Sequence, residues 1–261
     1  PAYAHKRGTR ALPRRSLVTQ TIICMKWGSR YSADFTNKLW SMVKRNTKRS
    51  TRLVCYTDDS RGINEDIQTH PLPPIDLPPE FEWLPWRKVS LWAPSVPGIE
   101  GDVLFLDLDL VVTGSLDEFF DYKPEETFCV IENWTQIGSG IGNTSTYRFR
   151  VGSHPYIYDR LQKDPGSVLG IYPNSQTYIS RTITSKAFWP RPWCESFKHT
   201  LLPPWPMNFV RTAALPREAC VVAFTGKPDP DEARDGRWKA PFWKKAYKHV
   251  RPTPWIAEHW Q

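Results

Sequence analysis

The chain has 261 residues, of which 40% are hydrophobic and 24% are charged, so it can bury a sizeable core and does not read as a disordered sequence. Its formal net charge of +8 favours anionic partners such as phosphates, nucleotides or an anionic membrane surface. No apolar run approaches the ~20 residues of a membrane span, and the five scattered cysteines form no CxxC pair, which together predict a cytoplasmic protein with reduced thiols.

The first half of the chain begins with a predicted basic N-terminal arm over residues 1–18. A strand is predicted within 16–27 and a second strand over 51–59. Between them, 32–47 is predicted as a helix because apolar residues recur at helical spacing, namely Phe35, Leu39, Met42 and Val43. A strand, a helix and a strand within so short a stretch form a βαβ unit, which implies a parallel sheet with ligands at the carboxyl ends of its strands.

The later elements alternate between short apolar runs and Pro- or Gly-rich connections. Because no repeat or long linker appears, we expect one α/β domain over 19–236, followed by an irregular, basic and aromatic C-terminal tail over 237–261. The predicted elements are a Pro-rich loop (69–80), a short helix (82–94), a strand (102–112), a turn with a helical start (113–122), a strand (127–133), a Gly- and Ser-rich connection (134–153), a helix (156–164), a short element of open type (177–183) and a late strand (218–226).

Two carboxylates interrupt the apolar run 103–112, "VLFLDLDLVV". Residues two apart in a strand point to the same side, so Asp107 and Asp109 can offer oxygen ligands to one cation. Mg²⁺ and Mn²⁺ prefer such oxygens and are commonly completed by substrate phosphates. The pair therefore indicates a divalent metal carrying a phosphorylated ligand, with a solvent-facing or capping aspartate at a strand end as the alternative.

The stretch "FLDLDLVVTGSLDEFF" (105–120) resembles the D-x-D region of GT-A fold glycosyltransferases, in particular the bacterial family 8-like enzymes. The resemblance covers roughly residues 19–230 and includes "CMKWGSRY" (24–31), "CYTDD" (55–59), "WRKVSLW" (86–92) and "AFTGKPDP" (223–230). It implies a Rossmann-like GT-A domain with a mixed, mainly parallel sheet. The implied activity is transfer of a sugar from a nucleotide-sugar donor, with a uridine diphosphate sugar as first candidate, to a glycan or lipid-linked acceptor with retention of configuration.

The resemblance also assigns roles to individual residues. It implies that Asp107 and Asp109 hold Mn²⁺ or Mg²⁺ against the donor diphosphate and act in catalysis. It places the nucleotide against Tyr31, Thr57 and Asp58. The remaining donor-binding positions that it implies are Lys88, Asn143, Thr144, Ser145, Gly226 and Lys227.

Two departures from the family pattern concern the same site. Family 8 enzymes carry a histidine as third metal ligand in a C-terminal motif, and Ala223 stands at that position here. His259 is the one candidate replacement near the C-terminus. An acidic motif around the donor sugar is replaced by "NSQ" (174–176), in which Gln176 remains as a candidate catalytic residue.

Two other functions stay open at this point. A phosphatase of the haloacid dehalogenase type uses a D-x-D-x-[TV] motif in which Asp107 would be the nucleophile and Asp109 the acid/base. A GT-A fold that binds a nucleotide or glycan without turnover would also explain the missing histidine. Interleaved aromatic and basic residues over 237–260 favour peripheral contact with an anionic membrane, whereas no nucleic-acid module is present and no nucleic-acid partner is expected.

Overall fold

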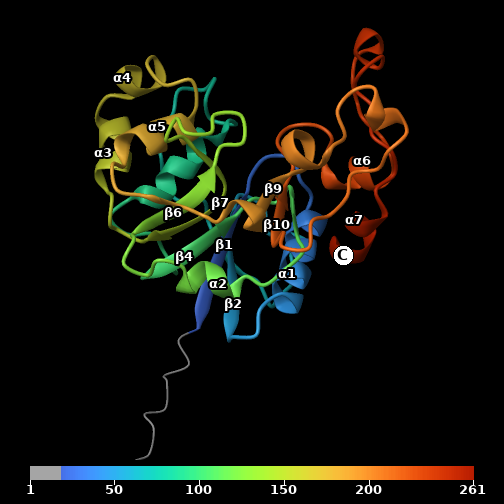
Figure 1. Ribbon diagram of the computed structural model, residues 1–261. Coiled ribbons are helices and arrows are strands. Elements are labelled where there is room, and N and C mark those ends of the chain that lie inside the picture. The colour runs from blue at the N-terminus through green and yellow to red at the C-terminus, as the bar shows by residue number, and fades with distance from the viewer. Residues whose placement is uncertain (1–18) are drawn as a thin grey trace, which may run out of the picture.

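A seven-stranded mixed sheet forms the centre of the computed structural model, which describes residues 19–261 (Figure 1). The predicted arm 1–18 lies outside the described residues. Neighbouring strands are parallel except at β7, which is antiparallel to both of its neighbours. In spatial order the strands are β3 (Gln68–His70), β2 (Thr51–Thr57), β1 (Gln20–Lys26), β4 (Asp102–Leu106), β7 (Gly142–Arg150), β6 (Phe128–Glu132) and β8 (Ala187–Phe188).

The βαβ unit is confirmed. Strand β1 is buried along its whole length and pairs in parallel with β2, and α1 (Ala33–Arg45) connects them. Helix α1 buries Leu39, Met42 and Val43 against one face of the sheet, as their spacing predicts. The carboxyl ends of β1, β2 and β4 therefore meet at one edge, where ligands bind in sheets of this kind.

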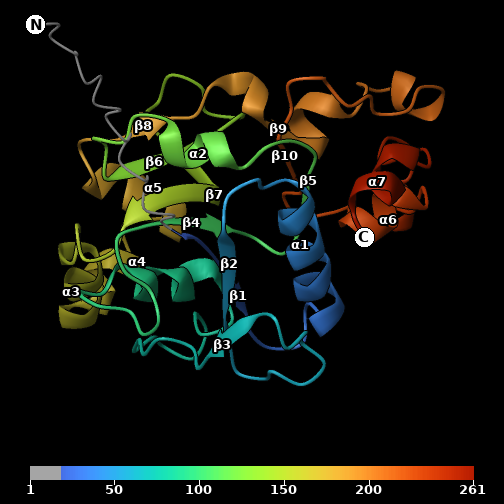
Figure 2. The same cartoon turned by 90° about the horizontal axis from the view of Figure 1, so that it is seen from below.

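Two apolar cores lie on opposite faces of the sheet, because successive strand residues point to opposite sides. Ile22 and Cys24 of β1 join the core beneath α1, while Ile23 and Met25 face the second core. The second core is covered by the 3₁₀-helix η1 (Pro85–Trp92), α3 (Tyr156–Lys163), α4 (Pro165–Leu169) and α5 (Ser175–Thr182), as Figure 2 shows from below.

The single strand predicted over 102–112 is wrong, because the chain leaves the large sheet at Leu106. It re-enters regular structure as β5 (Leu110–Val112), which belongs to a separate three-stranded sheet with β10 (Val221–Ala223) and β9 (Cys194–Ser196). Residues 103–106 of β4 and all of β5 are apolar and buried, so the sequence shows one continuous run. Asp107 and Asp109 lie in the short link between the two sheets.

The connection predicted over 134–153 is also wrong, since its second half forms β7. Polar side chains on this strand are buried, including Thr146 and Arg148. Because of them the segment lacks the apolar pattern from which a buried strand is predicted. The short element of open type is α5, and the helix predicted near 82–94 is the 3₁₀-helix η1.

Arg148 is only 1% exposed and has a structural role. Its guanidinium donates to the carbonyl oxygens of Phe119, Phe120, Tyr122, Lys123 and Glu126 at 2.7–3.2 Å. These carbonyls belong to the end of α2 (Asp117–Asp121) and the loop that follows it. A buried cation thus satisfies carbonyls that a helix end leaves without partners.

The C-terminal segment is irregular over most of its length but ends in α7 (Pro254–His259), which packs against β5 and α6 (Pro230–Arg234). Trp260 is buried against Phe35 of α1, so this end of the chain completes the first core. The remaining short helices are η2 (Arg191–Trp193), η3 (Phe197–Leu201), η4 (Met207–Phe209) and η5 (Phe242–Lys244). Within residues 19–261, no helix is long and apolar enough to cross a bilayer, and all five cysteines are unpaired.

Candidate active site

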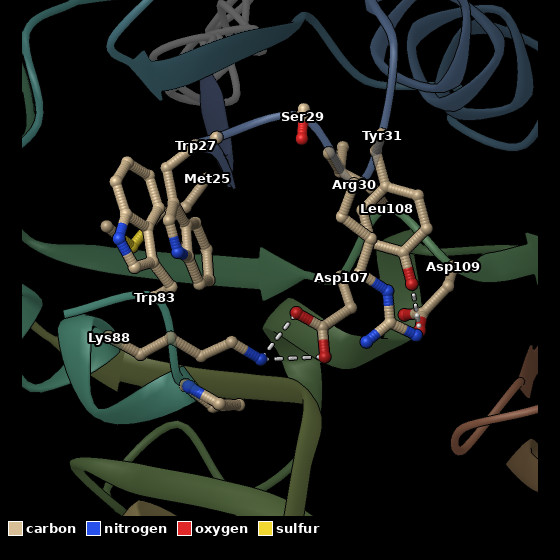
Figure 3. Close-up of a pocket in the computed structure, with 12 residues that line it drawn as sticks. Met25, Trp27, Ser29, Arg30, Tyr31, Trp83, Lys88, Asp107, Leu108 and Asp109 are labelled. Atoms are coloured by element: carbon tan, nitrogen blue, oxygen red, sulfur yellow. Dashed lines mark hydrogen bonds and ion pairs between the residues drawn. The ribbon is translucent and has the colours of Figure 1, made fainter. Parts of the chain in front are cut away.

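A pocket of about 310 Å³ opens at the carboxyl edge of the large sheet, where both predicted carboxylates line it (Figure 3). Its walls come from the end of β1, the start of η1 and the link between β4 and β5. The lining residues are Met25, Trp27, Gly28, Ser29, Arg30, Tyr31, Trp83, Pro85, Lys88, Asp107, Leu108 and Asp109.

Asp107 is paired with Lys88. The Lys88 Nζ donates to both carboxylate oxygens, at 2.5 and 2.7 Å, and the lysine side chain is only 8% exposed. The backbone N–H of Asp107 donates to the carbonyl of Ser145 on β7 at 2.9 Å, which fixes the position of this carboxylate. The predicted residues Lys88, Asp107 and Ser145 are therefore brought together.

Asp109 is partly buried and faces the other side of the pocket. Tyr31 Oη donates to its Oδ2 at 2.8 Å, and its carbonyl accepts from the backbone N–H of Phe224 at 3.0 Å. Burial, followed by the nearby charge of Asp107, raises the pKa of Asp109 to about 7. Burial also raises the pKa of Tyr31, so its hydroxyl stays protonated and continues to donate.

Arg30 is a site residue that the sequence analysis missed. Its guanidinium lies 5.0 Å from the centre of the Tyr31 ring and 3.7 Å from Oδ1 of Asp229, and the side chain is 58% exposed. Its place directly after the first strand is the signal that was available, since residues following parallel strands gather at this edge. With Lys88, it gives the pocket two cations beside the two carboxylates.

Two tryptophans that the sequence analysis also missed form the wall opposite Arg30 and Tyr31 in Figure 3. Trp83 is 61% exposed, and its ring lies so close to Gly28 that an added Cβ would approach it to 3.0 Å. Gly28 has a φ of +63°, which glycine adopts readily. An exposed indole over backbone offers a flat surface to a base or a sugar ring.

Thr57 and Asp58 lie at the carboxyl end of β2, as predicted, but line a neighbouring cavity with His70 rather than the pocket itself. The two places are connected, because Oδ2 of Asp58 accepts from the backbone N–H of Gly28 at 2.8 Å.

Asn143 and Thr144 are on β7, next to Ser145. Asn143 Oδ1 accepts from the backbone N–H of Ser145 at 3.0 Å, and both Asn143 and Thr144 are buried. Gln176 lies in the first turn of α5, outside the pocket lining. Its neighbour Ser175 donates to the Pro85 carbonyl at 3.2 Å and so joins α5 to the helix that carries Lys88.

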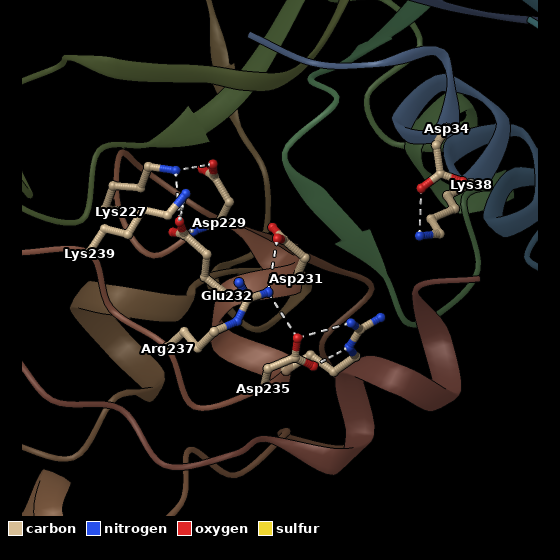
Figure 4. A network of polar contacts seen from close by, with 10 residues as sticks. Asp34, Lys38, Lys227, Asp229, Asp231, Glu232, Asp235, Arg237 and Lys239 are labelled. Carbon is tan, nitrogen blue, oxygen red and sulfur yellow. Dashed lines mark hydrogen bonds and ion pairs between the residues drawn. The ribbon is translucent and has the colours of Figure 1, made fainter. Parts of the chain in front are cut away.

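Lys227 follows β10 after Gly226, whose φ is +83°, and it does not line the pocket. Its ammonium binds Asp229 at 2.5 Å and Glu232 at 3.2 Å, within a network of charges around α6 (Figure 4). Burial lowers the pKa of Lys227, but these two hydrogen bonds outweigh that effect and raise it. The charge of Lys227 is thus already neutralised by carboxylates.

The oxygen ligands of Asp107 and Asp109 suit Mg²⁺ or Mn²⁺, which are often held by two carboxylates and substrate phosphates. Among residues 19–261, no group of three His, Cys, Asp or Glu side chains is placed to hold a metal. Ala223 is buried on β10 opposite Leu110, and His259 does not replace the missing histidine. Its carbonyl accepts from Arg45, at the end of α1 far from Tyr31.

The chain matches no family model, and no curated protein matches its sequence. Solved structures do resemble it. Galactosyltransferase LgtC, in complex with donor and acceptor sugar analogs, superposes with a TM-score of 0.56 at 13% identity, over 81% of this chain and 89% of that one. GlyE of Streptococcus pneumoniae TIGR4 gives 0.54 at 13% identity over 81% and 56%. Mouse xyloside xylosyltransferase 1 gives 0.51 at 12% identity over 80% and 98%. The predicted GT-A fold is confirmed.

Proposed function

We propose that this GT-A chain is a glycosyltransferase that uses a nucleotide-sugar donor. The observation that carries the proposal is the position of Asp107 and Asp109, at the carboxyl edge of the sheet between two cations and an aromatic wall. The neighbours in fold are glycosyltransferases, and one of them binds donor and acceptor sugar analogs. No observation favours the phosphatase alternative.

In this proposal the donor diphosphate lies between Lys88 and Arg30. Lysine binds phosphate as a compact charge, and the planar guanidinium of arginine can bind two phosphate oxygens at once. The base or the sugar ring would lie on the exposed indole of Trp83. A uridine diphosphate sugar is the first donor to test, and a glycan or a lipid-linked sugar is the proposed acceptor.

A Mn²⁺ or Mg²⁺ ion held by Asp107 and Asp109 would neutralise charge on the departing nucleoside diphosphate. The chain's own cations, Lys88 and Arg30, act in the same direction. The acceptor hydroxyl oxygen forms a bond to the anomeric carbon, whose bond to the phosphate oxygen breaks, and the diphosphate leaves with that electron pair. In a front-face reaction that retains configuration, the hydroxyl proton passes to the leaving phosphate oxygen, so no separate protein base is needed.

We propose that an exposed aromatic tip makes the peripheral contact with an anionic membrane. Residues 204–211 and 241–249 together form an aromatic tip, joined by hydrogen bonds from Trp205 to the Ala246 carbonyl and from Asn208 to the Tyr247 carbonyl. In Figure 1 part of this tip projects beyond α6. Phe242 and Trp243 are 86% and 72% exposed. The tip contains no acidic residue, and its cations are Arg211, Lys244, Lys245 and Lys248.

Exposed aromatics among lysines bind anionic interfaces through apolar insertion and charge attraction. The test is sedimentation with phosphatidylglycerol vesicles and with phosphatidylcholine vesicles. We expect binding to the anionic vesicles, lost on replacing Phe242 and Trp243 with Ser and unchanged on replacing the exposed Ile137 and Ile171 with Ser. Equal binding by both double variants would contradict a role for the tip.

The function itself is tested by thermal shift with UDP, GDP, CDP and ADP and their common sugar conjugates, each with and without Mn²⁺. A ligand at a hundredfold excess over its dissociation constant stabilises the fold by about 2.7 kcal/mol. We expect one nucleotide to act and Asp109→Asn to remove its Mn²⁺-dependent effect. Release of free sugar from the same donor, measured by NMR, separates an enzyme from a fold that only binds. Absence of any nucleotide shift would refute the proposal.

A further inference from the structure

The ammonium of Lys88 is paired with Asp107, one of the two carboxylates that would hold the metal ion in the proposed function. Both oxygens of Asp107 accept hydrogen bonds from Lys88 Nζ, so a cation that approaches the carboxylate from the same side must displace the ammonium. The ion pair is well shielded, since the Lys88 and Asp107 side chains are 8% and 20% exposed. Such a pair is held more strongly than one on the surface.

A divalent cation entering the pocket alone meets three obstacles. It must displace Lys88 from Asp107, and the displaced ammonium would remain nearby as a repelling charge. Arg30 adds a second positive charge on the Asp109 side. The described residues supply no third His, Cys, Asp or Glu ligand to offset these costs.

A bound diphosphate removes the same obstacles. Its oxygens supply the missing metal ligands, as they do at many Mg²⁺ sites. They also give Lys88 and Arg30 an anion to bind once a cation takes over Asp107. The arrangement therefore favours joint binding of cation and diphosphate over binding of either one alone.

We propose that Lys88 acts as a placeholder for the divalent cation, so that Mn²⁺ or Mg²⁺ binds Asp107 and Asp109 only together with a nucleoside diphosphate. This inference rests on the proposed donor site. It makes Lys88 the residue that couples the two ligands, and linkage requires each ligand to raise the affinity for the other by the same factor.

The test begins with Mn²⁺ alone, because that measurement needs no knowledge of the nucleotide. Binding of Mn²⁺ to the purified 261-residue chain is followed by the electron paramagnetic resonance signal of the free ion. We expect weak binding to the wild type and at least about tenfold tighter binding to Lys88→Met, a change within the usual range of such couplings. Lys88→Arg keeps the charge and should stay as weak as the wild type.

The matched control is Lys44→Met. Lys44 forms a 3.8 Å ion pair with Asp66 at the other end of α1, so this variant removes one positive charge without touching the pocket. It should bind Mn²⁺ like the wild type. Circular dichroism and melting temperature check that each variant is folded, and Lys88→Gln replaces Lys88→Met should the latter not fold.

The second measurement uses the nucleoside diphosphate that gives the largest thermal shift. Lys88→Met should bind it more weakly in Mn²⁺ than the wild type does, so the same change strengthens one ligand and weakens the other. A merely structural lysine would not produce opposite signs. The inference is overturned by tight binding of Mn²⁺ alone to the wild type, or by Mn²⁺ affinity that is unchanged in the neutral Lys88 variant. Failure of every nucleotide to bind would refute the proposed function and leave the Mn²⁺ result to decide on the placeholder.

Discussion

Replacing Arg148 with Met is predicted to destabilise the fold strongly without touching the pocket. The guanidinium makes five hydrogen bonds to carbonyl oxygens, and the three shortest, to Phe119, Tyr122 and Lys123, measure 2.7–2.8 Å. A hydrogen bond from a charged donor contributes about 1.5–3 kcal/mol, and part of the sum is offset by the cost of burying the charge. We expect a net loss of about 4 kcal/mol, because the carbonyls would be left buried without partners.

The assay is thermal and urea unfolding of the 261-residue chain. For a domain of this size, about 4 kcal/mol corresponds to a fall in melting temperature of roughly 8–16 °C. Arg148→Lys is the matched variant, since it keeps the charge but cannot reach the carbonyls on both sides. We expect it to recover less than half of the loss. A fall of under about 3 °C for Arg148→Met would refute the view that this residue holds the loop after α2 in place.

Three further predictions concern the pocket and a turn at the opposite edge of the large sheet. The free energy of unfolding of the metal-free protein should fall as pH rises from about 4 to about 7 and change little above that. The reason is that the pKa of Asp109 is about 7 in the folded state but about 3.9 in the unfolded state. Urea titrations in EDTA measure this dependence on pH, and Asp109→Asn should remove most of it. Gly152→Ala should cost more than about 2 kcal/mol in urea unfolding, since Gly152 has a φ of +73° and a Cβ there would lie 2.6 Å from the Pro94 carbonyl oxygen; an unchanged midpoint would contradict it. Tyr31→Phe should weaken Mn²⁺-dependent nucleotide binding in calorimetry, because the hydroxyl that positions Asp109 is lost, and equal affinity would argue against that role.

The sequence predicted the βαβ unit and the carboxylate pair because both depend on local pattern. Helical spacing fixes α1, and two aspartates in an apolar run stand out in any window. The division between β4 and β5 could not be read in the same way, since Leu106 and Leu110 are equally apolar and equally buried. Only the contacts with β10 show that the chain changes sheets there.

Strand β7 was missed because its buried polar residues have partners that lie far away in the sequence. Arg148 is buried on account of carbonyls more than twenty residues earlier, and nothing local indicates this. The partner of Asp107 was missed for the same reason. The direct side-chain partners of the two carboxylates, Lys88 and Tyr31, come from two other segments of the chain, and no local pattern pairs them with Asp107 and Asp109. The divalent metal expected at this pair stays a prediction.

Lys227 is the opposite case, because the sequence singles out the residue but does not show which groups it pairs with. The resemblance implies a donor-binding role for Lys227, yet two nearby carboxylates on one short segment, Asp229 and Glu232, already pair with its ammonium. A motif gives the type of residue and its place along the chain. It does not give the competing partners, which depend on how α6 folds back.

The link between the two sheets has a mechanical consequence. The backbone N–H of Asp107 donates to the Ser145 carbonyl in the large sheet. The carbonyl of Asp109 accepts from the backbone N–H of Phe224, which follows β10 of the small sheet. Any sliding of one sheet against the other must therefore change the separation of the two carboxylates. A ligand bound to both carboxylates would therefore restrict movement of one sheet relative to the other. Amide hydrogens in β5 and β10 should exchange more slowly once it is bound, although neither strand lines the pocket.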